Sequence, residues 1–481
     1  MFSLRKVCVY TEDSIQTHFG SGVKSSSPAA APHDAQLTAL LPLDPFSHET
    51  FSNGIRDFTM RVIGSLDSMH SVLFEFFTGT HQRLPVLSKL RFYNHLPSLP
   101  TSPRPDFATL CLCILLIQQM PPDGGISNVR SPLYVSVKSL INLLEMAGDL
   151  SLDFVHCRIL ITFYEMGHGL HKAAYLSIAA CARISRALGL HRKRWRDIAT
   201  NSDRLTLEEE KRTWWAIHNM DRYLSLCNGD PLLVTDDAER TDPLPIEDLL
   251  WSEGSFLDDL NDAIDTPPSL DTPFTITLGQ MARECQMSYI AGRVVRHVFS
   301  PTTDPDFNTE EAVQLERTLK SYLPLLAEEE LKIGKYCGAF GMCNRSVAFP
   351  SCNLHIYARR SNSCSALFML YESKLNQADE NAVDERFRLL QLIEDVSLRA
   401  IAFAEASYGD RAENYPREIH SPYLPYSLFQ SAVVQYRLWK HSNDVTFKQR
   451  FDTIKSILSE FTKRWMDACG SSELPRVRNI G

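Results

Sequence analysis

His218, Asp221 and Cys227 combine the side chains of a cysteine hydrolase within one short stretch. A cysteine nucleophile needs an imidazole within hydrogen-bond distance to take its proton. The apolar spacing around these residues predicts a helix, in which each residue advances by about 100°. Cys227 therefore lies on the face opposite His218, and one helix cannot form this pair. With no GxSxG or other nucleophile motif in the chain, an enzyme using a second segment is the alternative with the least support.

Metal-ligand side chains also occur near one another between residues 157 and 191. His168 and His171 flank a glycine at a predicted helix break, with Cys157, Cys181 and His191 nearby. No CxxC or carboxylate completes a zinc set, so we interpret them as structural residues. No cofactor or metal is assigned to this chain.

A single predicted helix from Thr206 to Asn228 carries most of the candidate residues. We expect Thr206 to cap this helix and Glu209 to complete a capping box. Its second half is apolar on nearly every face, which indicates burial in a larger helical body. Asp221 lies on that apolar surface, so it should be paired, because an isolated buried carboxylate is costly.

The same helix supplies the candidate ligand or regulatory contacts. Trp214 and Trp215 would line a ligand pocket or simply pack in the core. Asp221 and Arg222 would form a switch or a structural ion pair with another helix. The candidate contacts are Trp214, Trp215, His218, Asp221 and Arg222.

The composition is that of a globular protein, with 44% apolar and 22% charged residues among 481. The longest apolar run, residues 107–117, is too short to cross a bilayer, and the first residues lack a signal-peptide pattern. Twelve cysteines without regular pairing indicate reduced thiols in the nucleus or cytoplasm. Of the net charge of -9, residues 236–271 carry 1 - 12 = -11, which leaves +2 for the remainder. Bulk charge therefore predicts no nucleic-acid groove.

Helical periodicity predicts an all-α fold, a multi-helix bundle or helical array over residues 53–470. Residues 1–52 read as a disordered, mobile arm and 471–481 as a tail. The predicted helices are 55–77, 106–119, 133–147, 153–166, 171–188, 206–228, 277–299, 309–329, 353–371, 382–407, 424–440 and 446–466.

Two charged stretches have alternative interpretations. The basic run would be a nuclear-import signal or a solvated loop that complements a helix C-terminus. It comprises His191, Arg192, Lys193, Arg194 and Arg196. The acidic loop 236–272 mixes carboxylates with apolar residues, which is typical of activation segments, mainly over 252–272. Its part up to Trp251 would instead fold on the helical core.

Four segments within residues 153–251 resemble one family when taken in order. They are AAYLSIAACARISRALGLH (173–191), EKRTWWAIHNMDRYLSL (210–226), GDP (229–231) and DPLP (242–245). Together they resemble the regulatory domain, or middle homology region, of fungal zinc-cluster transcription factors. The resemblance implies a nuclear transcription regulator that contacts other transcription factors, the transcription machinery or a small-molecule inducer, and no membrane. The alternative is a helical scaffold without a transcriptional role.

A variant motif and a missing one refine the resemblance. YEMGHG at 164–169 is similar to members that control secondary-metabolite gene clusters. The family reads DNA through six cysteines that hold two zinc ions. Here only Cys8 precedes Cys111, and the chain contains no CxxC. The chain is thus expected to be a truncated product or a natural regulator that reaches DNA only indirectly or through a missing N-terminal module.

We predict that the purified 481-residue chain contains no stoichiometric zinc and gives no sequence-specific DNA shift. The physical reason is that it lacks the cysteine pairs that would hold the metal. Elemental analysis and gel-shift selection on random duplexes measure both. Tight, specific DNA binding by the chain alone would contradict the prediction.

Overall fold

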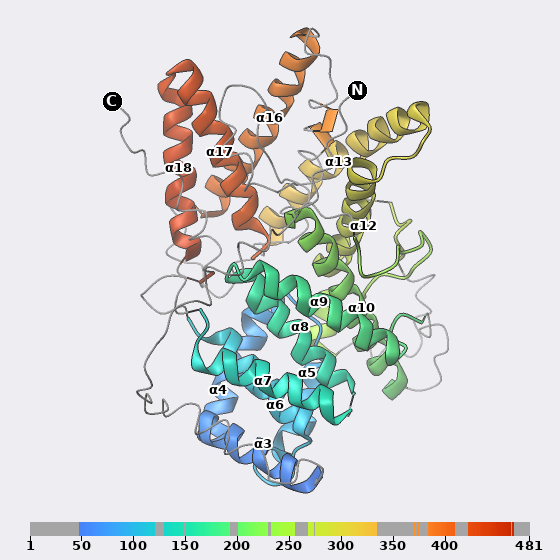
Figure 1. The fold of residues 1–481 in the computed structure, drawn as a ribbon, viewed down its shortest axis with the longest axis vertical. Coiled ribbons are helices and arrows are strands. Elements are labelled where there is room, and N and C mark those ends of the chain that lie inside the picture. The colour runs from blue at the N-terminus through green and yellow to red at the C-terminus, as the bar shows by residue number, and fades with distance from the viewer. Residues whose placement is uncertain are drawn as a thin grey trace, which may run out of the picture.

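The computed structural model describes residues 48–120, 129–148, 150–192, 201–228, 232–254, 268–273, 275–333, 370–371, 373–374, 383–408, 422–462 and 464–465. Within these ranges the chain is helical with no strand, apart from an isolated bridge between Pro243 and Ser269, so the all-α prediction is confirmed (Figure 1). The boundary at 470, residues 1–47 of the predicted arm, the tail and most of the predicted helix 353–371 lie outside this part, and the first described helix begins at His48, five residues before the predicted boundary at 53.

The helices fall into an N-terminal group and a C-terminal group. The first comprises α3 (His48–Ile63), α4 (Leu66–Thr78), α5 (Lys89–His95), α6 (Pro105–Gln118), α7 (Pro132–Ala147), α8 (Leu152–Gly167), α9 (His171–Ala187), α10 (Asn201–Asn228) and α11 (Asp248–Glu253), with 3-10 turns η1 (Thr80–Gln82) and η2 (Leu96–Ser98). The second comprises α12 (Gln280–Phe299), α13 (Pro305–Ile333), α16 (Val383–Tyr408), α17 (Leu424–Ser442) and α18 (Val445–Thr462).

Local sequence explains most helix ends. Ser65, Ser88, Ser131 and Ser151 each accept a hydrogen bond from a main-chain N–H in the first turn that follows. Gly148 ends α7 in the left-handed region with φ of 80°. The single helix predicted over 55–77 is wrong, because the chain leaves α3 through a left-handed glycine and Ser65 starts α4.

The start of α10 also differs from the prediction. The helix begins at Asn201, so Thr206 lies inside it and is not its cap. Glu209 is therefore not part of a capping box, and its carboxylate faces another segment of the chain. A Thr-x-x-Glu pattern marks a helix start only when nothing upstream continues the helix.

The core is built around two helices that are buried on nearly every side, α6 and α8. α6 packs against α3, α4, α7 and α8, while α8 also packs against α9 and α10. α10 then packs on α12, so this long helix runs from the N-terminal group into the C-terminal one (Figure 1). Among the described helices, none combines the length and the hydropathy that a membrane-spanning segment requires.

Two aromatic side chains fasten α17 and α18 to this core. Tyr423 meets the ring of Tyr223 on α10, with 4.5 Å between centroids. Trp465 packs edge-on against Phe163 at 5.6 Å and lies so close to Gly167 that a Cβ there would be 2.2 Å from its ring. The glycine at the end of α8 thus leaves room for the indole.

We predict that Gly167→Ala lowers the free energy of unfolding by about 2 kcal/mol, because its methyl group overlaps the Trp465 ring. In a Trp465→Ala background the same substitution should be neutral, or stabilising by up to about 1 kcal/mol through helix propensity. Urea unfolding of the four proteins completes the cycle. Equal effects of Gly167→Ala in both backgrounds would show that the indole does not occupy this space.

Candidate functional site: the charged face of α10

α10 carries an unusual number of buried polar and charged side chains. Each is at most 6% exposed, although a charge is costly to bury unless it is paired. These residues are Glu208, Glu209, Lys211, Arg212, His218, Asn219, Asp221 and Arg222. Their hydrogen-bond partners lie in three different parts of the chain.

Glu209 ties α10 to the segment before α5. Its carboxylate accepts from the Ser88 N–H at 2.8 Å and from Arg91 Nε at 2.7 Å. Arg91 also donates to Asp153 of α8, at 2.7 Å. Burial opposes the charge of Arg91, but Glu209 and Asp153 outweigh this and raise its pKa. One guanidinium therefore joins α5, α8 and α10.

Arg212 links α10 to the segment that follows it and to α12. It donates to Glu208 at 3.0 Å, to Asp248 at 2.8 Å and to the Ile246 carbonyl at 2.6 Å. Its guanidinium lies 4.9 Å from the centre of the Trp251 ring. The other oxygen of Asp248 accepts from the Met281 N–H at 3.1 Å and so caps α12 from outside.

His218 contacts α12 through a polar trio. Ser288 Oγ donates to Asn219 Oδ1 at 2.6 Å and lies 3.2 Å from His218 Nδ1. With the hydroxyl proton used in that way, Nδ1 carries the imidazole proton and donates to Ser288. Burial lowers the pKa of His218 well below its usual range, so the ring is neutral. The ring therefore has no lone pair facing the serine and cannot act as its base.

Asp221 and Arg222 pair with each other and with a loop, not with another helix as expected. Arg222 Nη1 donates to Asp221 at 2.6 Å, and Asp221 also accepts from the Thr235 N–H at 3.0 Å. Burial lowers the pKa of Arg222 to about 10 while Asp221 opposes that shift, so the group stays cationic at neutral pH. A Cβ at Gly292 would lie 2.7 Å from Arg222 Nε, so this glycine lets α12 cover the pair.

The two tryptophans have different surroundings. Trp215 is buried, and its indole N–H donates to the Pro243 carbonyl at 3.0 Å. Trp214 is partly exposed and lies under the Arg186 guanidinium, 5.9 Å from it, and near His191. Of the basic run, the described part of the chain includes only His191 and Arg192; Lys193, Arg194 and Arg196 lie outside it.

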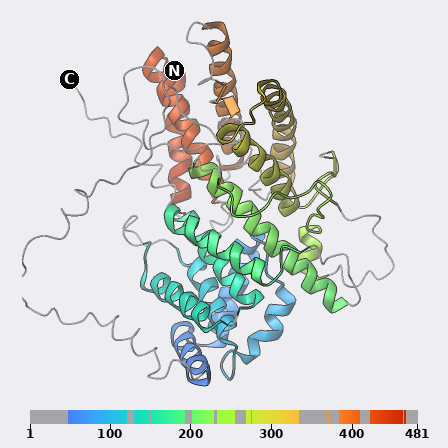
Figure 2. The same cartoon turned by 45° about the vertical axis from the view of Figure 1, so that its right-hand side comes forward.

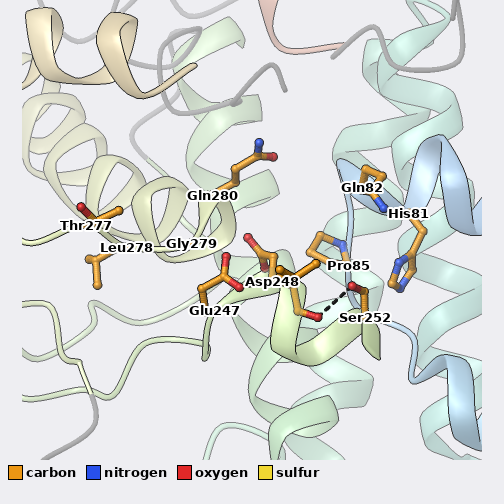
Figure 3. A pocket seen from close by; sticks show the side chains of 11 residues that line it. His81, Gln82, Pro85, Glu247, Asp248, Ser252, Thr277, Leu278, Gly279 and Gln280 are labelled. Carbon is orange, nitrogen blue, oxygen red and sulfur yellow. Dashed lines mark hydrogen bonds between the residues drawn. The ribbon is translucent and has the colours of Figure 1, made fainter. Parts of the chain in front are cut away.

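A pocket of about 130 Å³ opens beside Asp248, the partner of Arg212, and none of the five candidate contacts lines it (Figure 3). Three segments line it, residues 81–85, 247–252 and 277–280. Glu247 caps α11 by accepting from the Leu249 N–H at 2.7 Å. His81 is buried, and burial lowers its pKa to about 3 despite the bond of Nε2 to the Leu87 carbonyl. Sequence reasoning missed this pocket because its walls are far apart in the chain.

The cysteine and histidine side chains considered for metal binding are dispersed: Cys157, Cys181 and His168 are buried, whereas His171 and His191 are partly exposed. No group of three such ligands occurs among the residues placed by the structure. Cys157 donates to the Asp106 carbonyl and Cys181 to the Val155 carbonyl, while burial raises both thiol pKa values. His168 packs between the Tyr164 and Trp465 rings. These residues do not fit the paired-cysteine zinc cluster of the family that the sequence resembles.

Comparison with known proteins identifies the family. The fungal specific transcription factor domain matches residues 73–282, which include the whole charged face of α10. Transcription factor BOA15 of Botryotinia fuckeliana is 34% identical over 134 residues, 27% of this chain and 73% of BOA15. This chain belongs to the fungal transcription factor family. The predicted resemblance is thereby confirmed.

Other family members are more distant and longer. Transcription factor tazR of Aspergillus terreus is 23% identical over 34% of this chain and 26% of its own length. The citrinin biosynthesis transcriptional activator mrl3 of Monascus ruber is 23% identical over 46% of this chain and 43% of mrl3. The chain thus spans less than half the length of these two relatives. No solved structure matches it.

We predict that Glu209→Gln lowers the free energy of unfolding by about 3 kcal/mol, since it leaves the Arg91 charge with a weaker buried partner. The matched control is Glu310→Gln on the exposed surface of α13, which should change stability by less than about 0.5 kcal/mol. Denaturant unfolding at pH 7 measures both. Similar decreases in the free energy of unfolding of the two variants would show that the buried pair stabilises the fold no more than an exposed carboxylate does.

Proposed function

We propose that this chain regulates transcription in the nucleus as a family member whose helical body contacts other transcription factors or the transcription machinery. The observation that supports this most strongly is the family match over residues 73–282, the region whose buried ion pairs hold the fold together. A named citrinin activator among the relatives supports a narrower version, in which the target is a secondary-metabolite gene cluster.

Among the five candidate contacts, we propose Trp214 as the one that an outside molecule reaches. It is partly exposed beside Arg186, whereas the other four are buried and paired within the protein. Trp215, His218, Asp221 and Arg222 then have a positioning role: they fix the loop 234–243 and α12 against α10. The pocket beside Asp248 is proposed as the place where a small-molecule inducer would bind.

DNA contact is proposed to be indirect, through a partner or a further module, because the sequence contains no CxxC pair of the kind that holds the zinc cluster. The basic run 191–196 is proposed as the import signal. An enzymatic role has little support, since the Ser288 and His218 side chains that come together are both buried and the imidazole proton faces the hydroxyl.

We predict that fusing the full chain to an unrelated DNA-binding module changes the output of a reporter by at least about fivefold relative to the module alone. A fivefold change corresponds to a coupling free energy of about 1 kcal/mol. Deleting the gene should change transcripts of a biosynthetic gene cluster in the same organism. Reporter assays and transcript profiling are the measurements. An unchanged reporter together with unchanged transcripts would favour the scaffold alternative.

A further inference from the structure

α17 and α18 are connected at the end that points away from α8 and α9 (Figures 1 and 2). Positive and aromatic side chains of both helices contact one another near this connection. We name this surface the basic tip. It consists of Lys440, Lys448 and Arg450 with the rings of Tyr436, Trp439 and Phe447.

The basic tip carries more positive than negative charge. Residues 424–452 contain four basic residues and two acidic residues, Asp444 and Asp452. The Asp444 carboxylate already accepts from the Thr446 N–H at 2.8 Å, at the start of α18, and that bond lowers its pKa. The chain as a whole carries -9, so this positive surface is a local feature and not an average property.

Two exposed ammonium groups are held in place by one indole. Lys440 Nζ lies 4.5 Å from the centre of the Trp439 ring, and Lys448 Nζ lies 5.6 Å from it. Neither lysine forms an ion pair with any carboxylate in the described ranges. An aromatic face orients a cation without neutralising its charge, so both groups remain available to an anion.

Apolar surface continues the basic tip at the start of α18. Val445 is 61% exposed, and Phe447 is partly exposed below the Arg450 guanidinium, 5.6 Å from it. Arg450 reaches Glu394 of α16 only at 3.5 Å. The surface thus offers two free cations beside an apolar contact.

We propose that the basic tip binds an acidic peptide segment of a partner protein, with carboxylates on Lys440 and Lys448 and an apolar side chain on Val445 and Phe447. The basis is charge complementarity on a surface whose lysines have no partner among the described residues. This inference goes beyond the proposed transcriptional role and does not depend on it.

A peptide fits the basic tip better than a nucleic acid. Single-stranded nucleic acids bind by stacking bases on aromatic rings, and here the Trp439 ring already carries two ammonium groups. Duplex binding needs many phosphate contacts along a basic stripe, whereas this surface is confined to the ends of two helices. Exposed Val445 adds an apolar contact that a phosphate backbone would not use.

The test measures fluorescence anisotropy of a labelled peptide of about twelve residues that alternates Asp or Glu with Leu or Phe, titrated with the purified full chain. We expect a dissociation constant on the order of 10 µM that weakens as salt rises from about 50 to about 300 mM. The double variant Lys440→Gln/Lys448→Gln should weaken binding about tenfold, because two charge pairs are lost. An analogue with Asn and Gln in place of the acids should lose affinity similarly.

The matched control is Lys172→Gln/Lys455→Gln, which removes the same charge from exposed lysines on α9 and α18. It should weaken binding by less than about twofold. The unaltered chain and both double variants should have the same melting temperature, since the substituted side chains are exposed. Equal loss in the two double variants, or no binding of the acidic peptide by the unaltered chain, overturns the proposal. So does tighter, tip-dependent binding of a duplex or single-stranded oligonucleotide of equal length.

Discussion

The fold depends on the pairing of charges that α10 carries into the protein interior. Each buried ion costs several kcal/mol of desolvation, and this cost is offset only when partners are held at the right distance. Glu209, Arg212 and Asp221 find those partners before α5, after α10 and in the loop at 234–235. The segments that supply these partners are consequently fixed relative to one another. Apolar packing alone would define their relative positions less precisely.

Close backbone approach is the second requirement of this arrangement. Gly292 lets α12 pass directly over Arg222, and Gly279 lies beside the Asp248 carboxylate that caps the same helix. Asp248 thereby connects the Arg212 guanidinium to the first turn of α12. The pocket at this junction borders the ion pairs, so a ligand there would act on groups that already couple α10 to α12.

The sequence predicts those features that depend on a single helix. Helical spacing and glycine signals located most of the described helices, and the apolar surroundings of Asp221 predicted that it is paired. Local patterns could not tell a capping Glu209 from one whose partners lie about 120 residues away. For the same reason local patterns predict a partner of Arg222 on another helix, whereas Arg222 pairs with Asp221 beside it and with the loop at 235–237. A pocket lined by three distant segments also gives no local signal.

Charged residues serve different ends in the two groups of helices. Around α10 they are buried and satisfied, so altering them changes stability before it changes any contact with another molecule. α17 and α18 are instead fastened to the core mainly by the rings of Tyr423 and Trp465, together with one buried guanidinium, that of Arg464, which lies 4.0 Å from the Trp465 ring and donates to the Ile117 carbonyl. Lysines at the far end of those helices are thus not needed to hold the fold, because their charges lie outside the buried network. The binding of other molecules can change there without disturbing the interior, and this separation fits a regulator whose core must persist while its contacts vary.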